Sequence, residues 1–363
     1  MPSPPLKPDH AAWPKHALQA TGRCPVCQGV ERKTAYTDLR DELFACAGGQ
    51  WHMHACKQCQ THYLDPQPHP AHIGKAYSRY FTHADASATE PEEPKTQPWW
   101  KRALAHHAKA SLNSYRNAHW GMRLKPSNLW GKHWVPMLGP VQSLIDQQMR
   151  HLPRRPPRPG ARLLDIGCGN GAFLELAQQS GWVVRGIDLD PKAVAAAKAR
   201  GLDVQEGGLE ALTPALQDRF DWISCSHVLE HVHEPLQWLQ AMHALLRPGG
   251  TLWLQTPNIA SIGHSRYKAH WLGLDPPRHL SLWTLPTLTN AVRKAGFRTV
   301  RAHRLPVVSA MAVYAASEAL QQGHDNAIAL PHSQVPRLRY LWPALRQNWS
   351  VQRSEFHTLI AIR

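Results

Sequence analysis

Apolar and polar residues alternate in a regular order through the second half of the chain. Short apolar runs of the kind that form buried strands occur at 162–166, 182–188, 203–205, 220–226, 251–255, 298–305 and 357–363. Segments with apolar residues at every third or fourth position predict amphipathic helices between them, at 171–180, 191–200, 236–246 and 285–295. This alternation predicts an α/β fold with a doubly wound, mostly parallel sheet.

Turn and cap residues agree with this order. Gly181 and Gly201 each follow a predicted helix, as glycine commonly does at helix ends. Asp190 precedes Pro191, and this pair is typical of a helix N-terminus. About 50 residues separate the last two strands, so residues 306–354 are predicted to be an insertion or cap.

The first half of the chain has a different composition. Residues 1–20 are rich in proline and are predicted to be disordered. The stretch at 84–98 has the low complexity of a flexible linker, and 151–160 reads HLPRRPPRPG, which indicates a stiffer one. Between them, basic residues alternate with apolar ones at near-helical spacing over 101–117. Residues 84–160 are therefore predicted to be a linker and a basic, tryptophan-rich helical insertion.

The overall composition narrows the class of protein. With 363 residues, 43% of them hydrophobic, the chain has enough apolar material for a full core and is neither a disordered nor a fibrous protein. It has no apolar run near the roughly 18–20 residues that span a bilayer, and its first residues do not resemble a signal peptide. We therefore expect a cytoplasmic protein.

Positive charge is concentrated in one segment. The chain has 41 Lys and Arg against 26 Asp and Glu, a formal net charge of +15. Residues 95–162 hold thirteen of these basic residues, a single acid, Asp146, and five of the fifteen tryptophans. Such a segment is typical of binding to RNA, or to an anionic membrane surface at which the protein would be peripheral. The other interpretation is a solvated helical insertion whose tryptophans pack on the core.

A glycine-rich turn follows the first strand of the α/β region. Residues 164–171 read LDIGCGNG, and Gly167 and Gly169 let the backbone bend sharply and approach a ligand. The helix after the turn presents free N–H groups and the positive end of its dipole. Asp188 ends the next strand, where a carboxylate can accept both ribose hydroxyls of a nucleoside. Asp165 would repel a pyrophosphate and attract an ammonium group, so the site suits an adenosine joined to a cationic group.

At this point the chain resembles the class I S-adenosylmethionine (SAM)-dependent methyltransferases. Five motifs carry the resemblance in order: LLDIGCGNG, GIDLDP, FDWISCSHVLEHV, LRPGG and TPN. The resemblance covers residues 161–305 and 355–363. It implies SAM as the cofactor and a Rossmann-like, doubly wound sheet whose last strand is antiparallel.

The resemblance also implies a set of cofactor contacts. Asp188 would hold the ribose, Leu189 would pack on the adenine, and Ser226 would lie near the transferred methyl group. The other implied cofactor-binding residues are Asp165, Gly167, Cys168, Gly169, Gly171, Gly208 and Leu209.

One position departs from the family's pattern. The loop after the third strand usually has an acid after a glycine, which meets the adenine amino group. Here Leu209 follows Gly208, so Glu210 or backbone atoms must take that role. The thiols of Cys168 and Cys225 are expected to be buried as small core residues.

Two CxxC pairs lie near the start of the chain. Cys24 and Cys27 are separated by 28 residues from Cys56 and Cys59. An odd total of seven cysteines with this pairing argues against a disulfide scaffold. Each pair can place two thiolates on one tetrahedral Zn²⁺, and four cysteines would close the site, so the zinc would be structural. The alternative is reduced cysteines without a metal. Neighbouring residues that could replace one ligand are Cys46, His52, His54 and His62.

The sequence around the second pair extends the resemblance. CKQCQTHYLDPQP and AYSRYF are similar to the treble-clef or ribbon-like zinc module that precedes some small-molecule methyltransferases, including sugar C-methyltransferases. LDPPRHLSLW at 274–283 is similar to the other half of that subgroup's signature. The resemblance implies a small zinc-binding module at 21–83.

Methyl transfer requires alignment of the nucleophile, the methyl group and the sulfur, and removal of a proton from an O–H or C–H acceptor. His279 lies in a Pro-rich loop after the fifth strand and is the first candidate for the general base, with Arg278 binding an anionic group of the substrate. His227 and His231 follow the fourth strand and are the other candidates; absence of a protein base is the remaining option. Asn258, at the end of the fifth strand, is expected to hydrogen-bond the substrate.

These observations predict an enzyme with a small-molecule substrate. It would be a SAM-dependent methyltransferase with a structural zinc ion that acts on an anionic or carrier-linked metabolite, sugar-like or lipid-linked. One alternative is an RNA methyltransferase that binds its substrate through residues 95–162. The other is a non-catalytic SAM-binding interaction module.

Overall fold

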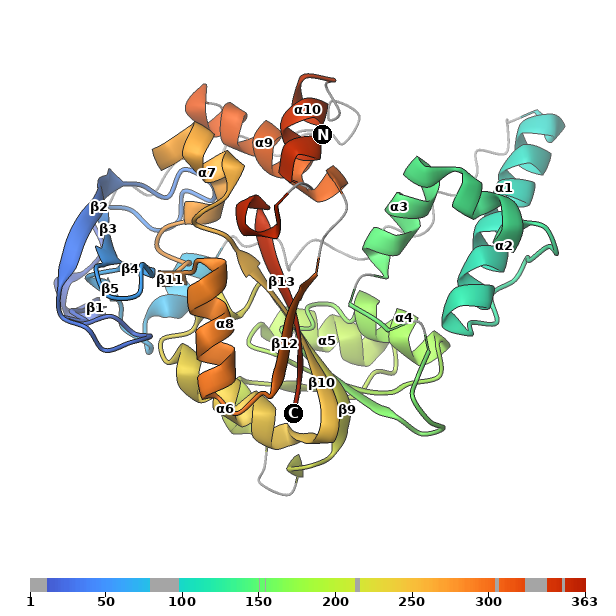
Figure 1. The fold of residues 1–363 in the computed structure, drawn as a ribbon, viewed down its shortest axis with the longest axis horizontal. Helices are drawn as coiled ribbons and strands as arrows, with labels where there is room; N and C mark the ends of the chain where they lie inside the picture. Colours follow the sequence, from blue (N-terminus) through green and yellow to red (C-terminus); the bar gives the residue numbers. More distant parts are fainter. Residues whose placement is uncertain are drawn as a thin grey trace. The chain divides into compact units, whose positions relative to one another are not determined.

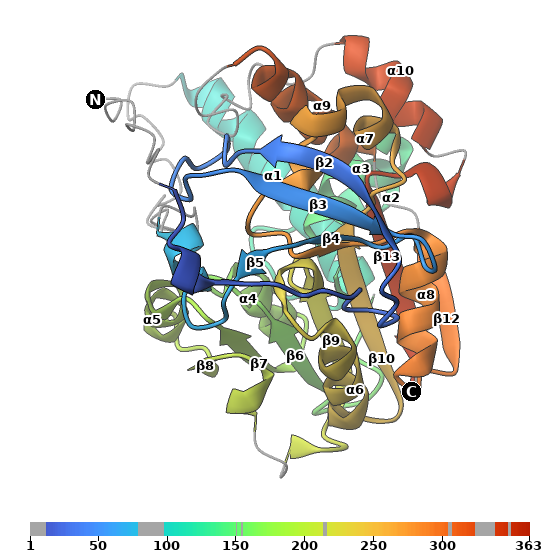
Figure 2. The same cartoon turned by 90° about the vertical axis from the view of Figure 1, so that its left-hand side faces the viewer.

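The chain divides into two compact units, whose helices and strands are drawn in Figures 1 and 2. Unit 1 comprises Met1–Tyr80, Cys225–Ala244 and Thr251–Arg363, and unit 2 comprises Phe81–Ser224 and Leu245–Gly250. The computed structural model describes residues 12–78, 98–149, 151–153, 155–212, 216–303, 307–323, 338–347 and 350–363. Unit 1 thus joins the N-terminal segment to the last third of the chain.

A seven-stranded mixed sheet has the order β12-β13-β10-β9-β6-β7-β8, and β9 and β10 have residues in both units. Its strands are β6 (Arg162–Ile166), β7 (Val183–Asp188), β8 (Val204–Glu206), β9 (Phe220–Ser226), β10 (Leu246–Pro257), β12 (Thr299–His303) and β13 (Phe356–Ile362). β7 pairs in parallel with β6 and β8, whereas β13 pairs antiparallel with β10 and β12. The predicted α/β fold with an antiparallel last strand is confirmed.

The helices of unit 2 fall into two groups. α4 (Ala172–Gln179) and α5 (Pro191–Ala199) follow β6 and β7, close to the predicted bounds. The Asp190 carboxylate accepts the Lys192 N–H at 3.0 Å, so the predicted cap of α5 is confirmed. The basic insertion forms α1 (Trp99–Trp120), α2 (Gly131–Trp134) and α3 (Gly139–Gln148), a separate group of helices in Figure 1. The predicted linker at 84–98 lies outside the described residues except for its last residue.

A four-stranded antiparallel sheet in unit 1 has the order β11-β4-β3-β2 and faces the viewer in Figure 2. Its strands are β2 (Arg32–Leu39), β3 (Trp51–Cys56), β4 (His62–Leu64) and β11 (Ser281–Leu282). β1 (Leu18–Gln19) and β5 (Gln67–Pro68) form a separate pair. Since Ser281 pairs with Tyr63, the loop that carries the LDPPRHLSLW motif is part of the same sheet as the N-terminal segment.

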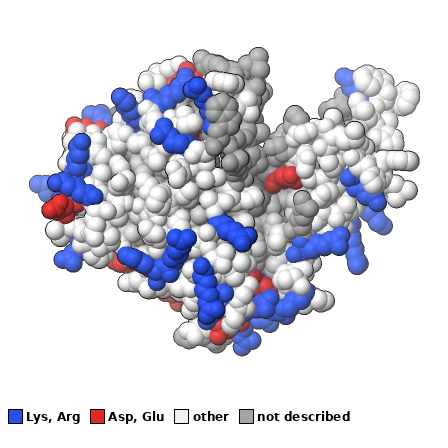
Figure 3. Space-filling view, in the orientation of Figure 1, with Lys and Arg blue, Asp and Glu red and all other residues white. Residues whose placement is uncertain are grey.

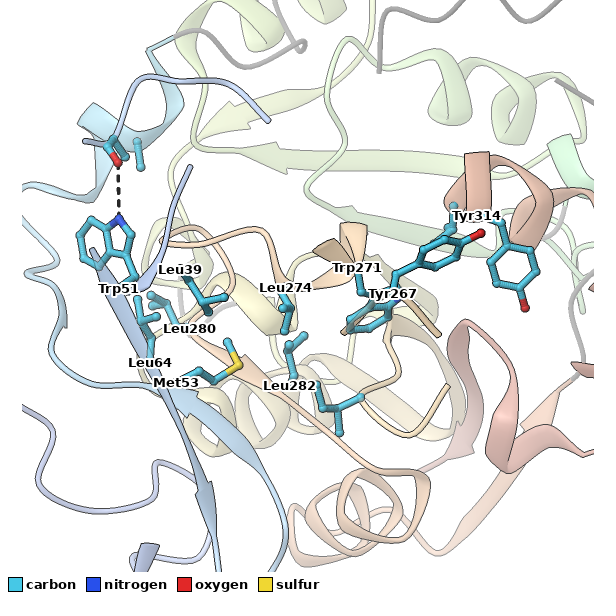
Figure 4. Close-up of a cluster of buried hydrophobic side chains, with 14 of the residues drawn as sticks. Leu39, Trp51, Met53, Leu64, Tyr267, Trp271, Leu274, Leu280, Leu282 and Tyr314 are labelled. Carbon is cyan, nitrogen blue, oxygen red and sulfur yellow. Dashed lines mark hydrogen bonds between the residues drawn. The ribbon is translucent and has the colours of Figure 1, made fainter. Parts of the chain in front are cut away.

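The buried core of unit 1 lies between this sheet and a group of helices (Figure 4). The helices of the unit are α6 (Pro235–Leu245), α7 (Ile262–Tyr267), α8 (Leu285–Lys294), α9 (Val307–Gln321) and α10 (Leu338–Gln347). Met53 and Leu64 of the sheet, Leu274 of the motif loop, Trp271, and Tyr314 of α9 all belong to one cluster. α9 also contacts α7 and α10, so the predicted insertion at 306–354 contributes to this core.

The described part of the N-terminal stretch is ordered, which corrects the predicted disorder of residues 1–20. Residues 12–20 contain a 3-10 turn, Lys15–Ala17, and strand β1. Trp13 is buried, its ring lies 5.5 Å from that of Trp51, and its indole N–H donates to the Ala17 carbonyl at 3.2 Å. A buried tryptophan contributes on the order of a few kcal/mol, which offsets the disorder that proline-rich composition favours. Residues 1–11 lie outside the described residues.

Candidate functional site

The glycine-rich turn after β6 adopts a conformation that glycine alone allows readily. Gly167, Gly169 and Gly171 have φ angles of 73°, 53° and 79°. A Cβ on Gly171 would lie 2.4 Å from a Leu202 methyl carbon, whereas one on Gly169 would meet nothing within 4 Å. Gly171 thus allows the turn to pack closely against α5 and the following Leu202. Gly169 leaves the backbone accessible to a ligand.

Asp188, at the end of β7, is bound to this turn. Its two carboxylate oxygens accept the N–H groups of Gly169 at 2.7 Å and of Asp190 at 2.9 Å. Its backbone carbonyl accepts the Gly207 N–H at 2.9 Å, which brings the loop after β8 to the same edge. Burial raises the pKa of the Asp188 carboxyl above its ordinary value. The carboxylate is therefore held in a fixed orientation and keeps lone pairs for further donors.

Asp165 belongs to the same unit and lies in β6, directly before the turn. It is 5% exposed, and the Ser224 hydroxyl donates to its Oδ1 at 2.6 Å. Burial raises the pKa of Asp165 to about 7, and the charge of Asp188 adds to the shift. A buried carboxyl of this kind gains from a cationic ligand, because the cation replaces the water that the charge has lost. Ser224 was not predicted; the signal was a polar residue in the middle of the predicted strand FDWISCS.

The remaining predicted cofactor residues have contrasting environments. Leu189 is 68% exposed directly after Asp188, so its side chain is free to cover a planar ligand. The Gly208 N–H donates to the Glu210 carboxylate at 2.7 Å, which fixes that carboxylate in the loop after β8. The Cys168 thiol is buried, as is that of Cys225, and both expectations are confirmed.

Ser226 ends β9 and belongs to unit 1. Its side chain is half-buried, with Oγ 3.5 Å from the amide oxygen of Gln255. His227 follows with a φ of 56°, and its N–H donates to the Gln255 carbonyl at 2.9 Å. Strand β9 therefore ends in a sharp turn that carries the first of the predicted histidines.

The four predicted metal-ligand cysteines converge in unit 1. Their Sγ atoms all lie within 4.8 Å of one another, with 3.6 Å between Cys24 and Cys59 and 3.4 Å between Cys27 and Cys56. These distances exclude disulfides, and they approach the roughly 3.8 Å between sulfurs of a tetrahedral Zn²⁺ site with Zn–S bonds of about 2.3 Å.

The backbone around the cysteines repeats one turn twice. Gln28 and Gln60 each follow the second cysteine of a pair, with a φ of 63° in both cases. Their N–H groups donate to the carbonyls of Cys24 and Cys56, at 3.0 and 2.9 Å. Two equivalent turns that each present two thiols are the arrangement expected of paired zinc knuckles.

Thiols of this group lie close enough to shift one another's pKa values. A hydrogen bond from the Cys24 thiol lowers the pKa of Cys59 to about 4, and the same bond raises the pKa of Cys24. Burial raises the pKa of Cys27 to about 11. Four soft donors without a cationic side chain among them fit a thiophilic divalent ion. Cys46 is not among the four converging cysteines. Its thiol instead contacts the Ala76 carbonyl at 3.2 Å.

The three predicted histidines surround one buried acid, Glu230. His227 Nδ1 lies 3.2 Å from Glu230 Oε1, and the rings of His231 and His279 are 4.7 Å apart. Glu230 is fully buried, and its neighbouring histidines lower its pKa to about 2 against the opposing effect of burial. Tyr77 also reaches this cluster, with its hydroxyl 3.0 Å from His231 Nδ1. The sequence signals that were missed are the acid inside HVLEH and the tyrosine inside AYSRYF.

Arg278 has a structural position instead of the predicted contact with the substrate. Its side chain is fully buried between two acids, Asp41 and Asp275. Nε lies 3.0 Å from both Asp275 oxygens, Nη1 lies 3.1 Å from Asp41 Oδ2, and Nη1 also donates to the Ala76 carbonyl at 3.0 Å. The guanidinium carbon lies 4.4 Å from the centre of the Phe44 ring. Its donors are thus paired within unit 1, which favours a structural role over the predicted contact with the substrate.

Asn258, predicted to contact the substrate, is a buried residue whose amide group is hydrogen-bonded to backbone. Its amide nitrogen donates to the carbonyls of Gln352 and Ser354, at 2.9 and 2.6 Å. Its amide oxygen accepts the Ala260 N–H at 2.8 Å. These bonds tie the end of β10 to the segment before β13, and they leave Asn258 no exposed surface.

Comparison with known proteins identifies the α/β region. Residues 141–302 match the family described as methyltransferase domain. A ubiquinone biosynthesis O-methyltransferase of Xanthomonas campestris pv. campestris (strain B100) is 37% identical over 125 residues, 33% of this chain and 52% of that protein. The protein of the same name from Ralstonia nicotianae is 32% identical over 151 residues, 39% of this chain and 63% of that protein. The chain thus spans about half the length of the first of these relatives and under two thirds of the second.

A solved structure gives a more distant likeness. The S-adenosylmethionine-dependent methyltransferase from Mesorhizobium loti is 22% identical and covers 61% of this chain and 98% of its own, with a TM-score of 0.41. At that TM-score the two chains share too little geometry for the likeness to bear on function. The chain therefore contains a methyltransferase domain on the evidence of its sequence match.

Proposed function

We propose that this chain, which contains a methyltransferase domain, is a SAM-dependent methyltransferase that acts on a small anionic or carrier-linked metabolite, sugar-like or lipid-linked. One observation carries the proposal: the open turn at Gly169 is bonded to Asp188 at 2.7 Å within the matched domain. A nucleoside site needs a carboxylate that accepts the ribose hydroxyls and a backbone segment without side chains that the ligand can approach closely. The turn at Gly169 and the Asp188 carboxylate provide both.

Each part of SAM has a candidate partner in this arrangement. Asp188 accepts the ribose hydroxyls, and the exposed Leu189 side chain covers the adenine. The negative charges of Asp165 and of the neighbouring Asp188 attract the ammonium group of the methionine part. Backbone of Gly208 and Leu209, with Glu210, takes the place of the missing acid at the adenine amino group. Bound SAM supplies an electrophilic methyl group on a sulfonium; the chain's residues bind and orient it.

The histidine cluster is the candidate for activation of the acceptor. His227 directly follows β9, and ligands of open α/β sheets bind at the carboxyl ends of the strands. His279 Nδ1 lies 2.7 Å from the Gly273 carbonyl, so this nitrogen carries the ring proton and Nε2 keeps its lone pair. Buried histidines with a free lone pair can activate an O–H or C–H group.

We also propose a structural zinc ion on Cys24, Cys27, Cys56 and Cys59. Four converging thiols and the two repeated turns support it. The closed donor set leaves no position for a substrate, so zinc would stabilise unit 1 and would not take part in the chemistry.

The basic insertion is proposed to bind an anionic membrane surface. Four of its five tryptophans are exposed, at 75% for Trp99, 51% for Trp100, 74% for Trp130 and 37% for Trp134. Leu129 and Met137 are also 79% and 82% exposed, so the tryptophans do not simply pack on the core. Lys and Arg are much more frequent than Asp and Glu on the face in Figure 3. Exposed aliphatic side chains favour lipid over RNA, because stacking on bases requires aromatic rings.

Two assays test these proposals. Purified protein is incubated with cell metabolites and SAM that carries an isotopically labelled methyl group, and mass spectrometry looks for one newly labelled small molecule. Labelled RNA in place of a small molecule would support the RNA alternative, and SAM binding without turnover would support a non-catalytic module. Co-sedimentation with anionic vesicles, expected at low salt and reduced at high salt, tests the membrane proposal; neutral vesicles are the control. No binding to anionic vesicles at low salt would refute it.

None of the described helices is long and apolar enough to cross a membrane.

A further inference from the structure

Three side chains of the histidine cluster form a second group of metal-ligand type, separate from the cysteines. One ligand atom from each of Glu230, His231 and His279 lies within 4.8 Å of those of the other two. Glu230 is fully buried, His279 is 8% exposed and His231 is half-buried. Among the described residues, Oε2 of Glu230 has no hydrogen-bond partner although it is buried.

Backbone contacts fix the proton on each histidine. His231 Nδ1 lies 3.0 Å from the Arg278 carbonyl, and His279 Nδ1 lies 2.7 Å from the Gly273 carbonyl. A carbonyl oxygen only accepts, so each Nδ1 carries its ring proton and each Nε2 has a lone pair; the Tyr77 hydroxyl, 3.0 Å from His231 Nδ1, can accept the same proton.

Glu230, His231 and His279 therefore direct acceptor atoms toward one another, with no donor among these three converging atoms. Two imidazole lone pairs and one carboxylate oxygen converge, and the charge of Glu230 is buried with them. An unpaired buried acceptor costs on the order of 1–3 kcal/mol, and a buried charge costs more. A cation bound between the three side chains would remove this cost.

We propose that Glu230, His231 and His279 bind a divalent transition-metal ion. Two histidines and one carboxylate are the donor set of open transition-metal sites, whereas Mg²⁺ and Ca²⁺ prefer oxygen alone.

The outer contacts of the three side chains match this assignment. Ligating histidines usually donate their other ring N–H to a carbonyl or carboxylate, and both histidines do so here. His227 contacts the other oxygen of Glu230 at 3.2 Å and so orients the carboxylate. Asp275 Oδ2 lies 3.9 Å from His279 Nε2, too far for a hydrogen bond, and Asp275 is already paired with Arg278. All three proposed ligands are thus held by partners outside the site.

Three protein ligands leave coordination positions for a further oxygen. A metal ion there would bind a hydroxyl or carboxylate oxygen of the acceptor and lower the pKa of a bound hydroxyl. This role rests on the proposed methyltransferase function; the binding of the ion does not. His279 is then a metal ligand, in place of the general base predicted from the sequence.

Cobalt(II) is a suitable probe, because its absorption spectrum distinguishes nitrogen and oxygen ligands from thiolates. Protein as purified is treated briefly with a mild chelator and titrated with Co²⁺. We expect one Co²⁺ per chain with visible d–d bands and without thiolate charge-transfer bands. Glu230→Gln and His279→Gln should each weaken Co²⁺ binding by about tenfold or more. The matched control is His233→Gln, since His233 also lies close to a carbonyl, that of Pro68 at 2.8 Å, but is outside the group.

Several results would overturn the proposal: no uptake of Co²⁺, thiolate bands alone, or unchanged affinity in Glu230→Gln. If the variants do not fold, crystals of the wild-type protein grown with Co²⁺ decide, because an anomalous-scattering peak is expected between the three side chains and its absence refutes the site. SAM binding and methyl transfer are measured on the same samples. Methyl transfer without Co²⁺ uptake would refute the metal site alone, and Co²⁺ uptake without methyl transfer would refute the enzymatic function alone.

Discussion

Replacement of Arg278 by methionine tests whether this residue is structural or binds substrate. Methionine keeps much of the side-chain volume and contact with Phe44 but removes the positive charge. Two carboxylates, Asp41 and Asp275, would then be left buried together. Asp41 keeps the backbone N–H groups of Phe44, Cys46 and Ala47, at 3.2, 3.0 and 3.0 Å, whereas Asp275 loses its paired charge.

Removal of one partner from a buried ion pair destabilises a protein by about 3–5 kcal/mol. The guanidinium makes several charge-assisted bonds here, so we expect a value in this range. For a folding unit of roughly 150–250 residues this corresponds to a fall in Tm of about 6–20 °C. Unfolding is followed by circular dichroism in urea and by heating, at constant pH.

A matched control separates charge loss from general damage. Arg266→Met removes an arginine of the same unit that lies over the Tyr267 ring at the surface, and it should change stability by less than about 1 kcal/mol. Asp41→Asn and Asp275→Asn in the Arg278→Met background should restore part of the lost stability, because the buried charges are removed. If Arg278→Met left stability unchanged and raised the KM for the acceptor, the structural role would be refuted and the contact with the substrate restored.

The other predictions concern the cofactor, the cysteines and the histidine cluster. Asp188→Ala should weaken SAM binding by about 1.5–3 kcal/mol, roughly 10- to 150-fold, in calorimetry, because it loses charge-assisted bonds to the ribose. SAM affinity should rise as pH increases through about 7, because Asp165, with its pKa of about 7, becomes ionised and attracts the ammonium; Asp165→Asn should abolish this dependence. Cys24→Ser should lower the zinc content measured by elemental analysis and reduce Tm more than it reduces turnover. His279→Asn should lower turnover by about 10²–10⁴ and leave SAM affinity nearly unchanged.

Each of these has a result that would contradict it. Unchanged SAM affinity in Asp188→Ala would remove this residue from the cofactor site. A pH dependence that persists in Asp165→Asn would have to come from another group. Wild-type protein purified without chelator and free of zinc would refute the cysteine site. More than about a tenth of wild-type turnover in His279→Asn would exclude His279 from activation of the acceptor.

Local patterns in the sequence were sufficient for most helices and strands of the α/β region. Strand β9 was predicted at its observed bounds, and α4, α5 and α8 within about one or two residues of theirs, because periodicity and caps act over a few neighbouring residues. The glycine-rich turn and the paired cysteines were also predictable, since the backbone requirement and the ligand spacing are local. The predicted disorder up to residue 20 was wrong for residues 12–20, because the burial of Trp13 against Trp51 depends on a residue 38 positions away.

The direction and partners of a side chain were decided by the tertiary structure. The sequence by itself determined that an arginine and a histidine stand in a stiff loop, Arg278 and His279, and that His227 and His231 follow a strand. Only the fold decided that Arg278 points into the core, because its partner Asp41 is 237 positions away and no local pattern contains it. Only the fold brought His279 to Glu230 and His231, across almost 50 residues of chain. Backbone conformation follows from short-range sterics and hydrogen bonds, whereas burial, charge pairing and convergence of ligands depend on contacts between distant segments.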